Sequence, residues 1–169
     1  MNMYSQVKVQ TEGKPIVFVG FAPGEESVLT FDPNNKLTGE PSFFPNAYSA
    51  FIWLDRQSRE NPEELPEALF VDLDQLLEEN FLLLNCLQRN PYLRTLPFIV
   101  VDRSEDDRRE LAFRPGVDDC FHTPLPWPRL RKRLAFLQRY KALLLNLLPP
   151  EETLPPRALP PGKRIFDLV

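Results

Sequence analysis

The chain of 169 residues has few of the side chains that bind transition metals or form cross-links, with one histidine and two cysteines. Cys86 and Cys120 both stand in apolar stretches, so we expect small core residues and neither a disulfide framework nor a zinc site. This cysteine usage fits a reducing, cytosolic setting. His122 has no serine, cysteine or aspartate partner in a triad pattern, so we expect a structural or exposed histidine.

Positive net charge and long apolar runs are also missing. Asp and Glu outnumber Lys and Arg by 24 to 20, and the net charge of -4 gives nucleic-acid binding no electrostatic support. No apolar run is long enough to span a bilayer, and the N-terminus lacks the basic-then-apolar pattern of a signal peptide. Because a glycine-rich phosphate loop and metal-ligand spacing are absent too, we predict no nucleic-acid partner, no cofactor and no metal site in this chain.

Proline, in contrast, is abundant, with 19 residues, many of them near the C-terminus. A segment so rich in proline cannot be helical throughout and is expected to be extended and semi-rigid. The remaining composition is that of an ordinary globular domain. The predicted organisation is an N-terminal extension (residues 1–14), one folded domain (15–147), a proline-rich linker (148–161) and a separate C-terminal segment (162–169).

Short apolar runs without polar alternation predict strands that are buried on both faces of a parallel sheet. The expected strands are residues 15–21, 27–31, 68–71, 98–101 and 119–122. Helices are expected after the capping residues Asn46 and Ser104 and in two further apolar stretches. The expected helices are residues 47–58, 80–89, 105–113 and 128–147, with a short or missing helix in the region 24–45. This alternation predicts an α/β fold around a five-stranded parallel sheet.

Asp72 ends a strand at the edge of the sheet where open α/β proteins place ligands and chemistry, and a short loop is expected to follow it. Asp102 should end the neighbouring strand, so the two carboxylates are candidates for a raised pKa or a shared cation. With Asp74, Arg103 and Thr123 they form the expected strand-end pocket. Two commoner roles remain open for Asp72, which are to cap a helix or to pair with Arg103.

Three segments in this order resemble the receiver domains of bacterial response regulators. They are the strand that ends in Asp72 with the helix opening at Phe81, residues 96–101, and residues 116–124. The first resembles the phospho-acceptor region, and the other two resemble the surroundings of the fourth and fifth receiver strands. The resemblance covers residues 66–140. It implies a receiver-like (flavodoxin-like) α/β/α fold in three layers, with the first helix shortened or missing.

The resemblance also shows what this chain has lost. Receivers hold a magnesium ion with two acidic residues after the first strand, and they use a hydroxyl after the fourth strand and a lysine after the fifth. The places of the acidic pair are occupied by residues such as Gly20, Phe21 and Ala22. Asp102 stands at the hydroxyl position and Thr123 at the lysine position. Since only Asp72 is retained, the resemblance implies a pseudo-receiver with a vestigial phospho-acceptor.

The expected helix 128–147 carries two apolar stripes, which is more than one sheet-packing face requires. The first stripe consists of Leu130, Leu134 and Leu137, and the second of Phe136, Tyr140, Leu143 and Leu147. The second stripe is covered either by the proline-rich tail or by a partner helix, for example in a homodimer. The basic residues of the helix are expected to be a solvated face, and they would contact anionic lipids if the chain continues into a membrane enzyme. They are Arg129, Arg131, Lys132, Arg133 and Arg139.

The segment Lys-Arg-Ile-Phe-Asp-Leu-Val, residues 163–169, resembles the opening of the catalytic domain of bacterial polyprenyl-phosphate hexose-1-phosphate transferases. In that family a membrane-embedded helix follows, and cations lie at the lipid headgroups before it. The resemblance implies a chain cut off after Val169, in which this domain regulates or assembles a sugar transferase of exopolysaccharide or O-antigen biosynthesis. The parent enzyme, with magnesium as its candidate cofactor, would transfer a hexose-1-phosphate from a nucleotide sugar to polyprenyl phosphate.

The implied partners are the catalytic domain of the same chain and, through the missing C-terminal part, the inner membrane, with this domain on the cytoplasmic side. An alternative of another class is a stand-alone, atypical response-regulator receiver that takes phosphate from a histidine kinase. A third is an adaptor or a small-molecule sensor that uses the strand-end pocket.

Overall fold

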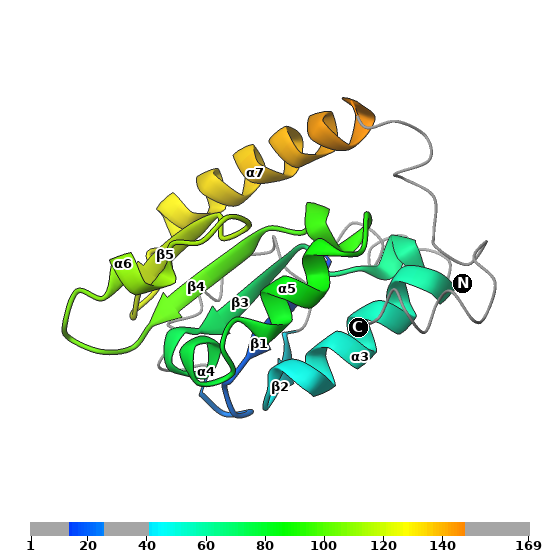
Figure 1. Ribbon diagram of the computed structural model, residues 1–169. Coiled ribbons are helices and arrows are strands. Elements are labelled where there is room, and N and C mark those ends of the chain that lie inside the picture. Colours follow the sequence, from blue (N-terminus) through cyan, green and yellow to red (C-terminus); the bar gives the residue numbers. More distant parts are fainter. Residues whose placement is uncertain (1–13, 26–40, 148–169) are drawn as a thin grey trace, which may run out of the picture.

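The computed structural model describes residues 14–25 and 41–147, which form three α/β/α layers around a five-stranded sheet (Figure 1). The strands are β1 (Ile16–Val19), β2 (Ser42–Phe44), β3 (Ala68–Asp72), β4 (Phe98–Asp102) and β5 (Asp119–His122). Neighbouring strands are all parallel, in the order β2-β1-β3-β4-β5. The predicted α/β fold with a five-stranded parallel sheet is therefore confirmed.

Helices cover both faces of this sheet. They are α3 (Ala47–Glu60), α4 (Leu73–Glu78), α5 (Leu82–Gln88), α6 (Arg109–Ala112) and α7 (Trp127–Leu147), with the 3-10 turns η1 (Pro62–Glu64) and η2 (Leu93–Thr95). One face packs against α3, α4 and α5, and the other against α7 (Figure 1). In the part of the chain that the structure describes, no helix is both long and apolar enough to cross a bilayer.

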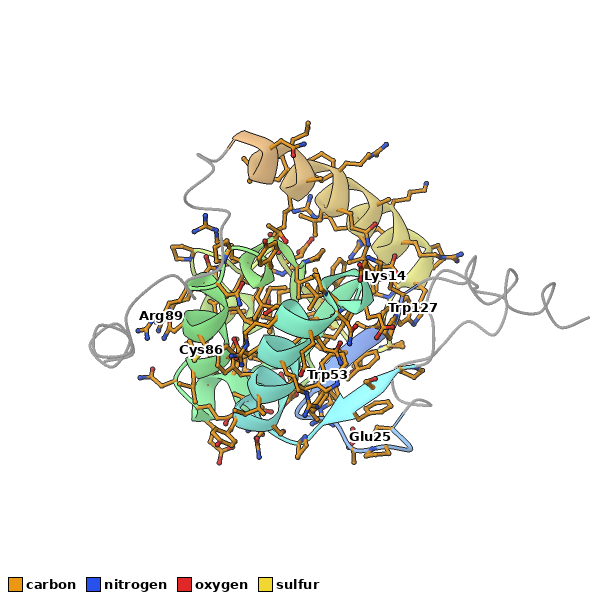
Figure 2. The ribbon with its side chains drawn as sticks, turned by 90° about the vertical axis from the view of Figure 1, so that its right-hand side faces the viewer. Lys14, Glu25, Trp53, Cys86, Arg89 and Trp127 are labelled. Carbon is orange, nitrogen blue, oxygen red and sulfur yellow. The ribbon has the colours of Figure 1, made fainter. Side chains whose placement is uncertain are left out.

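Successive side chains of each buried strand point to opposite faces of the sheet, which creates two separate cores. In β1, Val17 faces the core under α3 and α5, whereas Phe18 faces the core under α7. The second core is rich in aromatic rings, and Phe70 lies 5.2 Å from Phe18 and 5.9 Å from Trp127 between ring centroids. Trp53 marks the first core, and Figure 2 labels both tryptophans. The β-sheet is thus buried on both faces, as its unbroken apolar runs predict.

The edge strand β2 is the one strand of this sheet that the sequence pattern does not reveal. It has only three residues, Ser42–Phe44, which are half-buried and pair with β1 alone. Such a short edge strand carries too few residues for a periodic signal. The strand predicted at residues 27–31 lies outside the described residues.

Two helices differ from the sequence predictions. The expected loop after Asp72 is the helix α4, and the Asp72 carboxylate caps it by accepting a hydrogen bond from the Gln75 N–H at 3.1 Å. The helix expected at residues 105–113 is reduced to α6. The reason is that Ser104, the expected cap, donates to the Asp102 carboxylate through its N–H and hydroxyl at 3.0 and 2.9 Å. The cap predicted at Asn46 is confirmed, since its side chain accepts a hydrogen bond from the Ser49 N–H at 2.9 Å.

Candidate functional site

The site lies at the carboxyl ends of two neighbouring strands. β3 and β4 pair in parallel register, which places Asp72 opposite Val101 and Asp102 one residue further along. Both aspartates are almost completely buried, with 3% and 0% of their surface exposed. Two buried carboxylates at adjacent strand ends need compensating charge or hydrogen bonds to remain ionised. The structure supplies both.

Both oxygens of the Asp72 carboxylate are engaged. Oδ2 accepts the capping hydrogen bond from the Gln75 N–H, and Oδ1 accepts a hydrogen bond from Arg103 Nε at 3.1 Å. The two roles that the sequence leaves open for this residue, helix cap and partner of Arg103, therefore occur together. Burial raises the pKa of Asp72, and the contacts with Arg103 and Gln75 oppose that effect.

Arg103 ties the segment after β1 to the end of β3. Its guanidinium pairs with Asp72 and with the carboxylate of Glu25, and Nη2 donates to the Gly20 carbonyl at 3.2 Å. The guanidinium also lies 4.6 Å from the centre of the Phe21 ring. One cation thus lies among two carboxylates and a carbonyl, which are oxygen ligands of the type that hard divalent ions prefer.

Gly20 allows the chain after β1 to approach this cluster closely. Its φ of +88° is in the left-handed region, and a Cβ there would lie 2.9 Å from the Cβ atoms of Asp72 and Gln75. Only glycine fits that approach without displacing the cap of α4.

Asp102 has its own arginine. Its Oδ1 accepts from Arg108 Nη2 at 2.7 Å as well as from Ser104, and Arg108 Nη1 binds Asp74 Oδ1 at 2.7 Å. Burial alone would raise the pKa of Asp102, but the hydrogen bonds from Arg108 and Ser104 outweigh it and leave the pKa lowered. Of the two alternatives for the strand-end aspartates, a raised pKa fits Asp72, whereas a shared cation does not occur because each aspartate has a separate guanidinium.

The remaining candidates lie around this pair. Thr123, at the lysine position of receivers, donates its backbone N–H to the Asp102 carbonyl at 3.3 Å. His122 Nδ1 is 3.9 Å from Asp102 Oδ2. Cys120 is buried, which raises the pKa of its thiol to about 11, whereas Cys86 is partly exposed; both are free thiols. Within residues 14–25 and 41–147, no group of three or more His, Cys, Asp or Glu side chains could hold a metal ion.

The sequence predicts a strand-end site of Asp72, Asp74, Asp102, Arg103 and Thr123, and the structure places all five at the same end of the sheet. The sequence prediction does not include Glu25 and Arg108. The ion pair of Glu25 with Arg103 spans 78 positions, so no local pattern indicates it. Arg108 was within reach of a sequence argument, because a basic residue six positions after a strand-end aspartate can fold back onto it.

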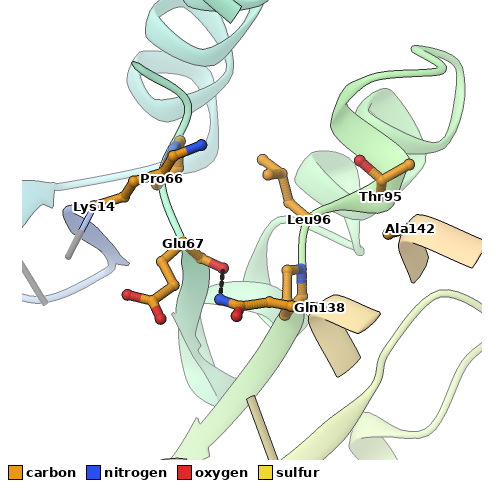
Figure 3. A pocket seen from close by; sticks show the side chains of 8 residues that line it. Lys14, Pro66, Glu67, Thr95, Leu96, Gln138 and Ala142 are labelled. Atoms are coloured by element: carbon orange, nitrogen blue, oxygen red, sulfur yellow. Dashed lines mark hydrogen bonds between the residues drawn. The ribbon is translucent and has the colours of Figure 1, made fainter. Parts of the chain in front are cut away.

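A separate hollow of about 460 Å³ lies at the opposite, amino ends of β1, β3 and β4. It is lined by Lys14, Pro66, Glu67, Thr95, Leu96, Pro97, Gln138 and Ala142. Figure 3 shows the Gln138 side chain reaching the Glu67 carbonyl, to which its amide donates at 3.5 Å. Burial raises the pKa of Glu67. The hollow is mostly apolar and is separated from the aspartates by the length of the strands, so it takes no part in their chemistry.

The two stripes of α7 have different surroundings. Leu130, Leu134 and Leu137 are buried against the sheet. Phe136, Tyr140 and Leu143 are exposed by 49, 48 and 63%, and the Phe136 and Tyr140 rings stack at 5.9 Å. The side chain of Leu147, the fourth member of that stripe, lies outside the described part of the chain. The domain therefore presents an apolar stripe that its own described residues do not cover.

No protein-family model matches the chain, and no curated protein matches its sequence. Solved structures do match. The bacteriophytochrome response regulator AtBRR is 20% identical, with a TM-score of 0.54 over 75% of this chain and 93% of its own. A protein from Chloroflexus aurantiacus described as a response regulator is 17% identical, with a TM-score of 0.56 over 76% of this chain and 99% of its own.

A third match is the bacteriophytochrome response regulator RtBRR, which is 21% identical with a TM-score of 0.51 over 74% of this chain and 78% of its own. Identities at this level show similarity of fold. The chain therefore has the fold of a response-regulator receiver domain, as the resemblance of its strand-end segments implies.

Proposed function

We propose that this chain is an atypical receiver-like regulatory domain that works through contacts with other proteins and without phosphoryl transfer at Asp72. The observation that carries the proposal is the position of Arg103, whose guanidinium binds Asp72, Glu25 and the Gly20 carbonyl at once. The fold shared with response regulators supports a regulatory role, and the occupied carboxylate argues against a phosphorylated one.

Phosphoryl transfer to an aspartate needs an accessible carboxylate oxygen and a divalent cation that neutralises the transferring group. The Asp72 side chain is 5% exposed, and both of its oxygens already accept hydrogen bonds. The guanidinium of Arg103 lies among the oxygens of Asp72, Glu25 and Gly20, and unlike a metal ion it has no open coordination position for a phosphoryl oxygen. Its contacts hold the ends of β1, β3 and β4 together.

The test is to offer the intact chain a phosphoryl donor and an analogue. We expect no mass increase with acetyl phosphate and magnesium, and no change in the amide spectrum around Asp72 with beryllofluoride and magnesium. The Asp72→Asn variant, which has no acceptor carboxylate, is the matched control for any signal. A phosphoryl adduct that appears in the wild type and is absent from that variant would replace the proposal with that of a phosphorylated signalling receiver.

The link to a sugar transferase is a finer proposal that rests on residues 163–169, which lie outside the described residues. It would make this domain a regulatory or assembly unit of a membrane-associated transferase, on the cytoplasmic side of the inner membrane. Reading the source gene past the codon for Val169 tests it. An apolar helix followed by a polar domain supports the proposal, and a stop codon removes it.

A homodimer through α7 is a competing proposal for the use of the exposed stripe of Phe136, Tyr140 and Leu143. Sedimentation velocity over a range of protein concentrations tests it. A wild-type chain that sediments as a monomer at all concentrations contradicts it.

A further inference from the structure

The helix α7 is unusual for a surface helix because its charge has only one sign. Between Trp127 and Leu147 it has six lysine and arginine residues and no aspartate or glutamate, in a chain whose net charge is -4. Within the domain, Arg133 Nε binds Asp119 at 3.0 Å and Lys141 Nζ binds Asp118 at 2.7 Å, which neutralises these two cations. Lys132 and Arg139, which are exposed, add to a local positive potential on this side of the molecule.

Cationic and apolar side chains share one ridge on the outside of α7. Lys132, Phe136, Arg139 and Leu143 follow at spacings of four, three and four residues, which places them in one row along the helix. All four are exposed, and we call them the outer ridge. Neither Lys132 nor Arg139 has an ion-pair partner among the residues that the structure describes. Tyr140 flanks the row and stacks on Phe136.

Three kinds of binding partner differ in how well they complement the charges and apolar groups of this ridge. A second copy that packs α7 against α7 would bring cations of one sign together with no acid on either helix. A wholly apolar protein surface would bury Lys132 and Arg139 without partners, and the desolvation of each unpaired charge is unfavourable. An anionic bilayer surface provides phosphate groups for the cations and the headgroup–acyl boundary for Phe136 and Leu143.

We propose that the outer ridge of α7 docks the domain onto the surface of an anionic membrane, with the helix lying in the plane of the interface. Lys132 and Arg139 reach the lipid phosphates through their long stems, and the interleaved rings and leucine enter the boundary region. Figure 1 shows α7 as the outermost element on its side of the sheet, so no other described element lies between it and a flat surface. The sheet and the arginine-bound aspartates remain in water.

The test is co-sedimentation of the full chain with vesicles of phosphatidylcholine alone and of phosphatidylcholine mixed equally with phosphatidylglycerol. We expect binding to the anionic vesicles only, weakened by added salt because exposed charges are screened. The double variant Lys132→Glu/Arg139→Glu should lose at least roughly thirtyfold in affinity, since each cation near an anionic surface contributes about fivefold. The variant Phe136→Ser/Leu143→Ser should bind more weakly at every salt concentration.

Matched controls lie on the opposite face of the sheet. Arg89 follows α5 and is exposed, and Tyr48 on α3 is 69% exposed; Figure 2 shows Arg89 on another side of the molecule from α7. Arg89→Glu and Tyr48→Ser should bind anionic vesicles as the wild type does. Because all of these positions are exposed, circular dichroism should show folded protein for each variant.

Three results would overturn the inference. They are no binding to anionic vesicles, binding that survives the double charge reversal, and a wild-type dimer that Phe136→Ser/Leu143→Ser dissociates without any vesicle binding. The last result assigns the ridge to a second copy. The inference does not depend on the state of Asp72, so failure of the vesicle test and failure of the phosphoryl-transfer test are separate outcomes.

Discussion

At the scale of single residues, the charge that surrounds Asp72 determines the chemistry of the strand-end site. A carboxylate at this place in a receiver-like fold is a potential phosphoryl acceptor, but this one caps α4 and binds Arg103. Arg103 directly follows β4, so the positive charge next to Asp72 is a side chain at the end of the neighbouring strand. The residue type at one position after β4 thus supplies the counter-charge for a buried strand-end carboxylate.

Substitutions of Asp72 separate the cap from the ion pair. Asp72→Asn retains an oxygen acceptor for the Gln75 N–H and removes a charge whose burial is unfavourable, so the cost should stay within about 1 kcal/mol. Asp72→Ala leaves that N–H unpaired and should cost about 1–2 kcal/mol more. Urea denaturation of the two variants measures the difference. Equal losses would mean that the pair with Arg103, which is 32% exposed, contributes more than the cap.

Arg108 offers a prediction with a defined pH dependence. In the wild type the lowered pKa of Asp102 contributes stability at neutral pH that is lost as the pH falls through that pKa, below about 4. Arg108→Met leaves a fully buried carboxylate without its cation, which should cost about 3 kcal/mol at pH 7. The pKa of Asp102 then rises, so protonation relieves the variant at mildly acidic pH.

The difference in unfolding free energy between wild type and Arg108→Met should therefore shrink as the pH falls from about 7 to about 4.5. Denaturant titrations at several pH values measure it. Arg56→Met is the matched control, because Arg56 is exposed and its pair with Glu60 at 4.0 Å contributes little at any pH. A difference that is constant with pH would show that Asp102 does not change its protonation in the variant.

At the scale of elements, the sequence predicts those parts whose signals are strong and local. β3 and β4 have short unbroken apolar runs and α7 has a sustained helical period, and their predicted and observed bounds agree within one or two residues. α4 is missed because the segment after Asp72 is predicted to be a short loop, although Asp72, Leu73 and Leu76 already have the pattern of a capped helix. α6 is overestimated because Ser104 binds Asp102 instead of capping a helix, and sequence alone gives no measure of that competition.

Two leucines of α7 provide a test of how this element is placed. Leu134 is 3% exposed and packs against the sheet, so Leu134→Ala should cost about 2–5 kcal/mol. Leu143 is 63% exposed on the same helix, and Leu143→Ala should change stability by less than about 0.5 kcal/mol. Urea denaturation in the absence of lipid compares them. A large loss for Leu143→Ala would mean that another part of the chain or a second copy covers the stripe in solution.

At the scale of the whole molecule, the sheet is the part that both cores share. Val17 and Leu69 belong to the core under α3, α4 and α5, whereas their neighbours Phe18 and Phe70 belong to the core under α7. If one helix layer detached, it would expose one face of the sheet, and the other helix layer packs against the same strands. The fold therefore has no natural division into independently stable halves, and unfolding of the described domain should be a single cooperative event.

The two tryptophans report on this cooperativity from opposite layers. Trp53 on α3 packs near Phe44, with ring centroids 5.5 Å apart, and Trp127 at the start of α7 packs near Phe70. The variants Trp53→Phe and Trp127→Phe each leave one fluorescent probe, since the chain has two tryptophans. In each variant the fluorescence transition in urea should coincide with the loss of far-ultraviolet circular dichroism, because both layers depend on the same five strands. If the Trp127 signal changes at a lower urea concentration than the circular dichroism, α7 separates from the sheet before the rest unfolds. The helix that carries the outer ridge would then be a detachable element, and anionic vesicles should increase the difference between the two midpoints, because a membrane that binds the released α7 favours its release.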